Sequence, residues 1–189
     1  MQQNVVVFAS GSGTNFRAIC DRFHGSSAIS VTQLVTNKPD CGAVGIAATY
    51  DVPIHVLQPN QLNDPLWLVD IQPDLIVLAG FLKKIPAEMV HRFSGKIINL
   101  HPSLLPKYGG KGMYGMHVHR AVLENGETTS GITIHRVNEV YDEGETLFQK
   151  GIDISDCRTP EQIAARIQEL EHYWYPRIIE QELTGKCHG

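Results

Sequence analysis

The stretch Val5-Val6-Val7-Phe8-Ala9-Ser10-Gly11-Ser12-Gly13-Thr14-Asn15-Phe16 contains the pattern that decides the fold. Val5–Ala9 is a continuous apolar run, which is typical of a strand buried on both faces. Ser10–Asn15 is a loop of small residues, and apolar side chains then recur at helical spacing at Phe16, Ile19, Cys20 and Phe23. The stretch therefore predicts a buried strand, a glycine-rich loop and an amphipathic helix.

The same alternation continues through the first hundred residues. Helices are predicted at Ala43–Thr49 and from Pro86, because proline suits the first helical turn. Further strands are predicted at Val31–Thr36, Ile54–Leu57, Leu75–Ala79 and Ile97–Leu100. Strands that alternate with helices favour an α/β fold: an open, mostly parallel Rossmann-like sheet with helices on both faces.

After residue 100 the pattern changes. Tyr108–Gly115 is rich in glycine and predicts a loop, and His117–Glu124 predicts a helix that ends at Asn125-Gly126. Gly131–Val137 and Glu145–Lys150 predict a pair of antiparallel strands, an extension at the C-terminal side of the sheet.

The last predicted helix begins with a capping box. Thr159 is followed three residues later by Gln162, and Pro160 occupies the first helical position. We expect Pro176 to interrupt this helix after an apolar stripe formed by Ile163, Ile167, Leu170 and Trp174.

Length and composition indicate one globular domain and argue against several other classes of protein. The chain has 189 residues, 42% hydrophobic and 19% charged, which is typical of one globular domain over residues 1–189. Its net charge of −4 argues against a general nucleic-acid or anionic-membrane binder. The longest apolar run, Leu75–Leu82, is far shorter than the roughly 20 residues that span a bilayer.

The N-terminus and the cysteines predict a cytoplasmic protein. Met1–Asn4 carries no basic residue before the apolar run, so no signal peptide is expected. Cys20, Cys41, Cys157 and Cys187 are scattered and include no Cys-x-x-Cys pair, so we expect them to be reduced, without metal or disulfide. No metal site is expected elsewhere, because His117 and His119 have no further ligands at suitable spacing.

The glycine loop predicts a phosphate site. Glycines allow the backbone to approach an anion, and the helix that follows offers unpaired N–H groups and the positive end of its dipole. The alternative is a tight turn that binds nothing. A dinucleotide is disfavoured because Phe16 replaces the third glycine and Thr36-Asn37 lacks an acidic residue, and an ATP loop because no Gly-Lys-Ser/Thr follows.

Asn99, His101 and Asp142 are the candidate catalytic residues. Asn99 and His101 are two residues apart on one strand, so their side chains share a face, where an amide and an imidazole could hold a carbonyl oxygen as it becomes an oxyanion. Asp142 beside the imidazole would raise the imidazole pKa above about 6.5, and could take a proton directly or through water. The alternatives are a structural Asn–His pair and a solvated turn aspartate. His135 is interpreted as a packed neighbour rather than a catalyst.

Three stretches together resemble the phosphoribosylglycinamide formyltransferase family of folate-dependent formyl-transfer enzymes. The first is Ser10–Phe16. The second is Leu78–Leu82 with Asn99-Leu100-His101-Pro102-Ser103-Leu104-Leu105-Pro106-Lys107-Tyr108. The third runs from Leu123-Glu124-Asn125-Gly126 through Gly131 and His135 to Asp142-Glu143-Gly144. The resemblance implies transfer of formyl from 10-formyltetrahydrofolate, as a co-substrate, to the amine of N1-(5-phospho-D-ribosyl)glycinamide in purine (IMP) biosynthesis, with no metal.

The resemblance also assigns residues. It makes about residues 1–100 the phosphate-binding half and about 101–189 the folate-binding and catalytic half. Asn99, His101 and Asp142 match the catalytic trio. Glu171 matches a carboxylate that contacts the ribose. The substrate phosphate would be bound by Gly11, Ser12, Gly13, Thr14, Asn15, Phe16 and Arg17. Folate would be bound by Leu82, Lys83, Lys84, Ile85, Asn99, Val140, Tyr141 and Asp142.

Two segments depart from the family pattern. The loop Gly109–Met116 is longer than usual, either as a lid in which Lys111 meets phosphate or as a surface insertion. Leu57–Asp74 is shorter and lacks a family arginine that reaches folate, which leaves Lys83 and Lys84 as nearby cations.

The rival functions are a formyltetrahydrofolate hydrolase and a folate- or nucleotide-binding module without catalysis. We expect small-molecule substrates, no nucleic acid and no membrane, and the oligomeric state is open, a homodimer included.

Overall fold

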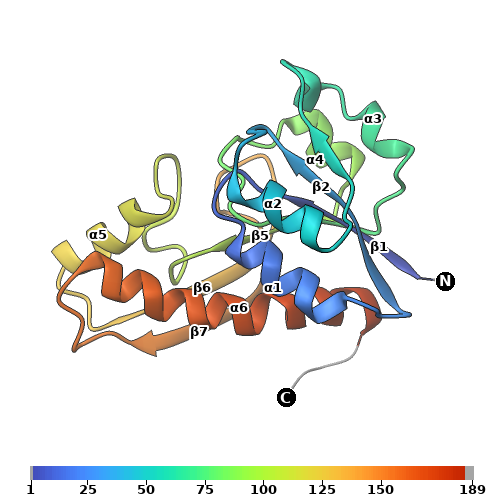
Figure 1. Cartoon of the computed structure of the whole chain (residues 1–189). Coiled ribbons are helices and arrows are strands. Elements are labelled where there is room, and N and C mark those ends of the chain that lie inside the picture. Colours follow the sequence, from blue (N-terminus) through green and yellow to red (C-terminus); the bar gives the residue numbers. More distant parts are fainter. Residues whose placement is uncertain (1, 186–189) are drawn as a thin grey trace.

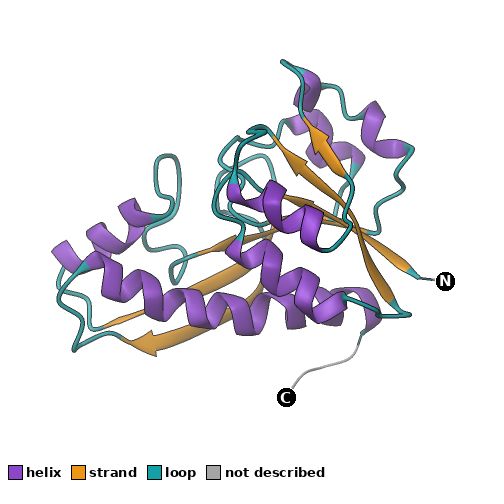
Figure 2. Ribbon diagram, viewed as in Figure 1, coloured by secondary structure: helices purple, strands orange, loops and turns teal. Residues whose placement is uncertain are grey.

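The computed structural model describes residues 2–185, which form one seven-stranded sheet flanked by helices (Figures 1 and 2). The strands lie in the order β3-β2-β1-β4-β5-β6-β7. Their bounds are β1 Gln3–Phe8, β2 Ile29–Thr36, β3 Ile54–Val56, β4 Leu75–Leu78, β5 Ile97–His101, β6 Thr129–Arg136 and β7 Thr146–Asp153. The longer helices are α1 Thr14–Phe23, α2 Gly42–Thr49, α4 Ala87–Arg92, α5 Met116–Glu124 and α6 Pro160–Thr184. The open α/β fold and its order of elements are confirmed.

The direction of winding reverses between β1 and β4. β1 pairs with both β2 and β4 in parallel, so the chain builds the sheet first to one side and then to the other. At such a switch point the loops after neighbouring strands leave on opposite faces and open a crevice at the carboxyl ends. The loop after β1, which begins at Ala9, and the loop after β4, which begins at Ala79, border this crevice.

The predicted antiparallel extension is confirmed. β6 pairs antiparallel with β5, so that Asn99 lies opposite His135 and His101 opposite Thr133. β7 pairs antiparallel with β6, and the register shifts between Ile134 and His135. The pairing places the end of β6 beside the start of β5, and the β6–β7 loop then folds back so that Asp142 lies 3.6 Å from His101 at the carboxyl end of β5.

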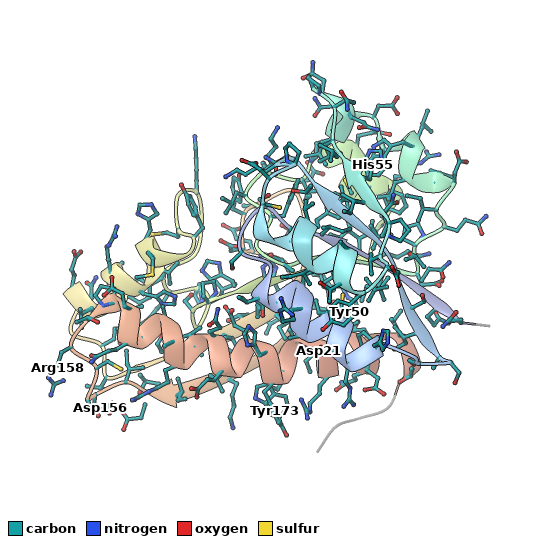
Figure 3. The ribbon with its side chains drawn as sticks, viewed as in Figure 1. Asp21, Tyr50, His55, Asp156, Arg158 and Tyr173 are labelled. Atoms are coloured by element: carbon teal, nitrogen blue, oxygen red, sulfur yellow. The ribbon has the colours of Figure 1, made fainter. Side chains whose placement is uncertain are left out.

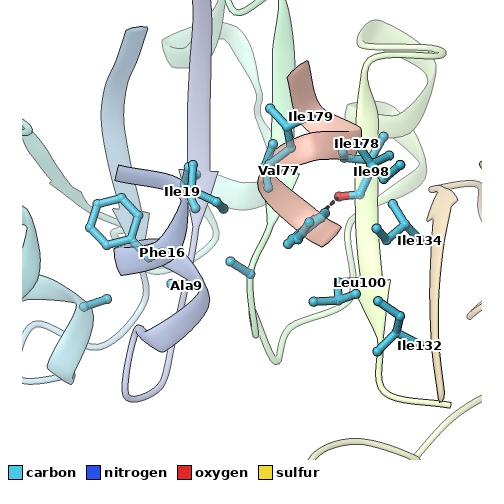
Figure 4. Packing of buried hydrophobic residues seen from close by; sticks show 14 of the residues in the cluster. Ala9, Phe16, Ile19, Val77, Ile98, Leu100, Ile132, Ile134, Ile178 and Ile179 are labelled. Atoms are coloured by element: carbon cyan, nitrogen blue, oxygen red, sulfur yellow. Dashed lines mark hydrogen bonds between the residues drawn. The ribbon is translucent and has the colours of Figure 1, made fainter. Parts of the chain in front are cut away.

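Each face of the sheet carries its own apolar core. One core packs the strands against α1, α2, α5 and α6, and the other packs them against α4 and the one-turn helix α3, Leu66–Val69. In Figure 4, Ile98 and Ile134 of the sheet lie close to Ile178 and Ile179 of α6. Phe16 and Ile19 of α1 are 0% exposed, as the helical spacing predicts.

The expected interruption at Pro176 is wrong, because α6 continues through Pro176 to Thr184. Proline removes a backbone hydrogen bond, but tertiary contacts after it offset this cost. Ile178 and Ile179 are buried in the core, and the hydroxyl of the fully buried Tyr175 donates to the carbonyls of Leu78 at 3.0 Å and Ile98 at 3.4 Å. The capping box at the start of α6 is confirmed.

Polar contacts outside the crevice join the elements at the surface. Tyr50, after α2, donates its hydroxyl hydrogen to Asp21 of α1, and both are labelled in Figure 3. At the start of α6, Arg166 donates to both carboxylate oxygens of Asp156 at 2.6 and 3.0 Å. Arg177 stacks on the ring of Tyr173, 3.6 Å from its centroid, on the exposed side of α6.

The region Leu57–Asp74 contains two short elements that the periodicity did not indicate. A 3-10 turn forms at Gln61–Asn63 and the one-turn helix α3 at Leu66–Val69. Trp67 anchors them by stacking on His55 and donating its indole N–H to the carbonyl of Gln61 at 3.1 Å. Within residues 2–185, no helix is both long and apolar enough to cross a bilayer.

Candidate active site

A cavity of about 580 Å³ opens at the carboxyl ends of β1, β4 and β5, at the switch point of the sheet. Its walls come from four loops: Gly11–Asn15 after β1, Leu78–Ile85 after β4, Gly110–Gly115 before α5, and the β6–β7 loop up to Asp142. Asn99, His101, His135 and Glu171 complete the lining. The structure therefore brings most of the residues selected from the sequence to one cavity.

The glycine loop ends in a turn that only glycine fits. Gly13 precedes α1 with φ +79°, and a Cβ built there would lie 2.6 Å from Cα of Ala43 in α2. No side chain caps α1, so the N–H groups of Thr14, Asn15 and Phe16 have no partner within the helix. These N–H groups and the helix dipole can hold an anion at this end of the cavity.

Phe16 and Arg17 do not contribute side chains to this site. The Phe16 ring is in the core, so only its N–H can take part. The N–H of Arg17 donates to the carbonyl of Gly13 at 2.8 Å, and its exposed side chain does not line the cavity. The expected phosphate ligands are thus reduced to Gly11–Asn15 and the N–H of Phe16.

Glu171 reaches the same end of the cavity from α6. Its Oε2 accepts a hydrogen bond of 2.8 Å from Nδ2 of Asn15, while Oδ1 of Asn15 is buried without a partner. Burial raises the pKa of Glu171 to about 7, although the bond from Asn15 acts to lower it. Asn15 and Glu171 therefore place polar side-chain groups beside the backbone N–H groups of α1.

His101, the last residue of β5, is held by one ring nitrogen. Its Nε2 lies 2.7 Å from the carbonyl oxygen of Tyr108, and because a carbonyl only accepts, Nε2 must carry the proton of that bond. Its Nδ1 lies 3.6 Å from Oδ2 of Asp142. Tyr108 adopts φ +57°, a conformation rare for a tyrosine, in presenting this carbonyl. Nδ1 is therefore the nitrogen that can exchange a proton.

The expected rise in the pKa of His101 is wrong. The ring is only 4% exposed, and burial lowers its pKa by more than the Asp142 carboxylate and the Tyr108 carbonyl raise it. Desolvation penalises the imidazolium more than one carboxylate 3.6 Å away stabilises it. Burial thus favours the neutral imidazole of His101, with a lone pair on Nδ1.

Asp142 sits in the β6–β7 loop with φ +57°. Gly144 allows this loop to fold against β6, because a Cβ there would lie 1.7 Å from the carbonyl oxygen of Arg136. The N–H of Gly110 donates to Oδ2 of Asp142 at 2.8 Å. Burial acts to raise the pKa of Asp142, but His135, His101 and the Gly110 N–H together lower it, so the carboxylate is ionised at neutral pH.

Asn99 and His135 form a pair beside this carboxylate. Nδ1 of His135 lies 2.9 Å from the carbonyl of Arg136 and donates to it, and Nε2 lies 3.2 Å from Nδ2 of Asn99, from which it accepts when it carries no proton. This bond uses one amide hydrogen of Asn99 and leaves the other for a ligand. His135 Nε2 is also 3.6 Å from Oδ1 of Asp142.

The far end of the cavity is apolar and exposed. Leu82 is 52% exposed and Val140 51%, and Nζ of Lys84 lies 5.3 Å from the centre of the Tyr141 ring. Lys83 and Ile85 also line this wall. Such exposed apolar side chains around a cavity are typical of a site for a planar aromatic ligand.

Sequence reasoning missed the backbone groups of the site and interpreted His135 only as a packed neighbour. His135 lies directly opposite Asn99 across the strand pair, a signal that could have been read only with the register known. The carbonyl of Tyr108 and the N–H of Gly110 are backbone groups, which sequence patterns do not single out. Lys111, Met113 and Tyr114 of the Gly109–Met116 loop line the cavity, so this loop is part of its wall.

Two further features concern the possible metal ligands and the cysteines of the part of the chain described. Among residues 2–185, no cluster of three or more His, Cys, Asp or Glu side chains is placed to hold a metal ion. His119 is buried with its Nδ1 unbonded, and His117 packs on the ring of Tyr114. Cys20, Cys41 and Cys157 are free, while Cys187 lies outside the described residues.

A match to a protein-family model shows the family of this chain. The family model described as formyl transferase matches residues 3–179, nearly the whole chain. This chain belongs to the formyl transferase family. The family's match includes the glycine loop, both strands that carry Asn99 and His135, and the Asp142 loop.

Curated relatives in the formyl transferase family have a common name. A chloroplastic phosphoribosylglycinamide formyltransferase of Arabidopsis thaliana is 43% identical over 94% of this chain. The phosphoribosylglycinamide formyltransferase of Bacillus subtilis is 36% identical over 94% of this chain and 93% of its own length. This chain spans 64% of the Arabidopsis protein and 60% of its Vigna unguiculata counterpart, less than two thirds of either.

Solved structures agree with this relationship. The phosphoribosylglycinamide formyltransferase of Anaplasma phagocytophilum superposes with a TM-score of 0.89 at 28% identity, covering 98% of this chain and 89% of that one. Glycinamide ribonucleotide transformylase 1 of Symbiobacterium toebii gives a TM-score of 0.88 at 28% identity, covering 100% and 92%. The fold is thus that of these formyl transferases.

Proposed function

We propose that this protein transfers the formyl group of 10-formyltetrahydrofolate to the amine of N1-(5-phospho-D-ribosyl)glycinamide in purine biosynthesis. The observation that carries the proposal is the convergence of Asn99, His101, His135 and Asp142 in a cavity that continues to the N-terminus of α1. A formyl transfer between two bound substrates needs such a cavity, with a binding end for each substrate and proton-transferring groups between them. The names of the relatives support the same reaction.

The two substrates would occupy opposite ends of the cavity. The 5′-phosphate would accept hydrogen bonds from the backbone of Gly11–Phe16, and Glu171 would accept from a ribose hydroxyl. The pterin of the folate would lie against Leu82–Ile85 and against the backbone of Val140–Asp142. Lys83 and Lys84 are the exposed cations beside that wall and would meet the acidic tail of the folate.

The chemistry would be a direct attack. The amine nitrogen forms a bond to the formyl carbon, the carbonyl electron pair moves to oxygen, and the remaining N–H of Asn99 stabilises the oxyanion. The bond from the formyl carbon to N10 of the folate then breaks, and N10 must gain the proton that the amine loses. The Asp142 carboxylate and Nδ1 of neutral His101, 3.6 Å apart, form the route for that proton, directly or through water.

His135 would keep Asn99 and Asp142 in place during these steps. It accepts from the Asn99 amide, which orients the free N–H, and its ring stands beside Oδ1 of Asp142.

We place the reaction in the cytoplasm, in line with the predicted reduced cysteines, of which Cys20, Cys41 and Cys157 are free.

One assay separates this function from its rivals. The protein is mixed with 10-formyltetrahydrofolate, and release of tetrahydrofolate is followed with and without the ribonucleotide. We expect release only when the ribonucleotide is present, with formation of the formylated ribonucleotide in equal amount. Release that does not depend on the ribonucleotide indicates a hydrolase, and no release in either mixture indicates a binding module; either result contradicts the proposal.

A further inference from the structure

Ser10 joins three loops at the switch point of the sheet. It follows β1, is 3% exposed, and donates its hydroxyl hydrogen to Oδ1 of Asn37, in the loop after β2, at 2.6 Å. The same oxygen lies 3.4 Å from the N–H of Leu82, which donates to it from the loop after β4. The N–H of Ser10 donates to the carbonyl of Gly80 at 3.2 Å. One small residue thus contacts both walls of the cavity.

Asn37 fixes the orientation of the Ser10 hydroxyl. Asn37 stands at the end of β2, where a dinucleotide-binding fold places an acidic residue for a ribose hydroxyl. Here its side-chain oxygen accepts from Ser10 instead. Because the Ser10 hydroxyl has one hydrogen, donation to Asn37 turns an oxygen lone pair toward Leu82. Asn37 therefore sets the orientation in which Ser10 can accept from the folate-side wall.

The two walls must be held at a fixed separation for the proposed reaction. One wall would bind the phosphate and so fix the position of the amine, and the other would bind the folate and so fix the formyl carbon. Reaction rates between bound groups fall steeply when the groups are misplaced, by about 10²-fold for 1 Å. Ser10 begins the segment that leads into one wall and is bonded to the other wall through Leu82 and Gly80, so it can fix this separation without touching either substrate.

We propose that Ser10, oriented by Asn37, is a positioning residue that couples the phosphate-binding loop to the folate-binding loop. The inference rests on the proposed function for its kinetic consequence, but the coupling itself can be measured without turnover. Phosphate bound to the glycine loop would restrain Ser10, and through the Ser10 oxygen it would restrain the N–H of Leu82.

The first experiment measures hydrogen exchange at the Leu82 amide by NMR, with inorganic phosphate as the probe. In the wild type we expect saturating phosphate to slow this exchange at least threefold. Ser130→Ala is the matched control, because Ser130 is also 3% exposed but its hydroxyl has no partner. We expect Ser130→Ala to retain the slowing and Ser10→Ala to lose it. Slowing that persists in Ser10→Ala, or no slowing in the wild type, overturns the coupling.

The second experiment measures kcat and both KM values. We expect Ser10→Ala to lower kcat about tenfold and to change each KM less than threefold, because spacing and not contact is lost. Asn37→Ala should lower kcat in the same way, and the double variant should be no worse than the worse single variant. Unchanged kcat with raised KM, or additive losses, contradicts the positioning role.

The two experiments separate the two proposals. If the wild type transfers no formyl group, the proposed function fails, and the exchange experiment alone decides whether Ser10 couples the loops. If Ser10→Ala does not fold, Asn37→Ala serves in both experiments, because Asn37 is only partly buried and its replacement leaves the Ser10 backbone bond to Gly80 in place.

Discussion

At one end of the cavity, the groups available to a ligand are mostly backbone N–H groups of a single stretch, Gly11–Phe16, with the Glu171 side chain beside them. At the other end, the groups are side chains from three elements: Asn99 and His101 from β5, His135 from β6, and Asp142 from the following loop. We call these the phosphate end and the transfer end. Backbone donors do not titrate and tolerate changes of side chain, whereas the transfer end depends on the charge of Asp142, the ring protons of the two histidines and the orientation of the Asn99 amide.

This difference shows how binding and chemistry place different demands on a chain. An anion can be held by the start of any helix whose turn leaves its N–H groups accessible. Proton transfer needs groups whose pKa values and separations suit the proton that is moved, and in this chain these groups come from distant parts of the sequence. The predictions below test this contrast from the largest expected effect to the smallest.

Asn99→Ala should give the largest effect. It removes the one N–H that the proposed mechanism directs at the oxyanion, and loss of one such donor lowers turnover by roughly 10²–10³-fold. We expect kcat to fall by this factor while KM for the ribonucleotide changes little. Steady-state kinetics measure both, with Asn63→Ala, an exposed residue outside the cavity, as the matched control. Near-normal kcat would remove Asn99 from the mechanism.

Gly13→Ala should be the most damaging change at the phosphate end. A side chain at φ +79° is strained by about 1–2 kcal/mol, and its Cβ would collide with Ala43. We expect the Kd for ribose 5-phosphate to rise roughly tenfold or more, since 1.4 kcal/mol corresponds to tenfold. Gly45→Ala is the control, because that glycine of α2 has open space around it. Equal affinities in both variants would exclude the loop as the phosphate site.

The pH response of His101 tests the desolvation argument at the transfer end. We expect the ring of His101, followed by NMR, to titrate below 6.5, because burial lowers its pKa. Asp142→Asn should lower this pKa further, since it removes a charge that favours the imidazolium. Stability linked to His101 should accordingly be present above pH 6.5 and be lost as the pH falls below it. Titration above 6.5 would contradict the desolvation argument.

Arg17→Ala should give the smallest effect. The exposed side chain does not line the cavity, and its N–H remains bonded to Gly13. Exposed substitutions of this kind change free energies by about 0.5 kcal/mol or less, so the Kd for ribose 5-phosphate should change no more than about twofold. Isothermal titration checks this against Arg120→Ala, a second exposed arginine. A tenfold loss would show that a side chain carries the phosphate end.

Local patterns located the strand, loop and helix that form the phosphate end. The apolar run before Ser10 and the helical spacing after Asn15 are properties of neighbouring residues, so the strand, loop and helix could be located from the sequence. The sequence did not show that the Phe16 ring is buried in the core or that the N–H of Arg17 is bonded to Gly13 within the helix, because burial and internal hydrogen bonds depend on packing. The same limit applies to α6, where Pro176 looked like an end and packing after it keeps the helix intact.

The sequence by itself determined the order of the elements, the glycine turn before α1 and the shared face of Asn99 and His101, because each follows from the spacing of residues a few positions apart. Only the tertiary structure decided the neutral state of His101, the place of His135 beside Asn99, and the contacts of Ser10 with two other loops. Burial, strand register and loop-to-loop hydrogen bonds depend on residues far apart in the chain. They are therefore fixed by packing and not by local sequence.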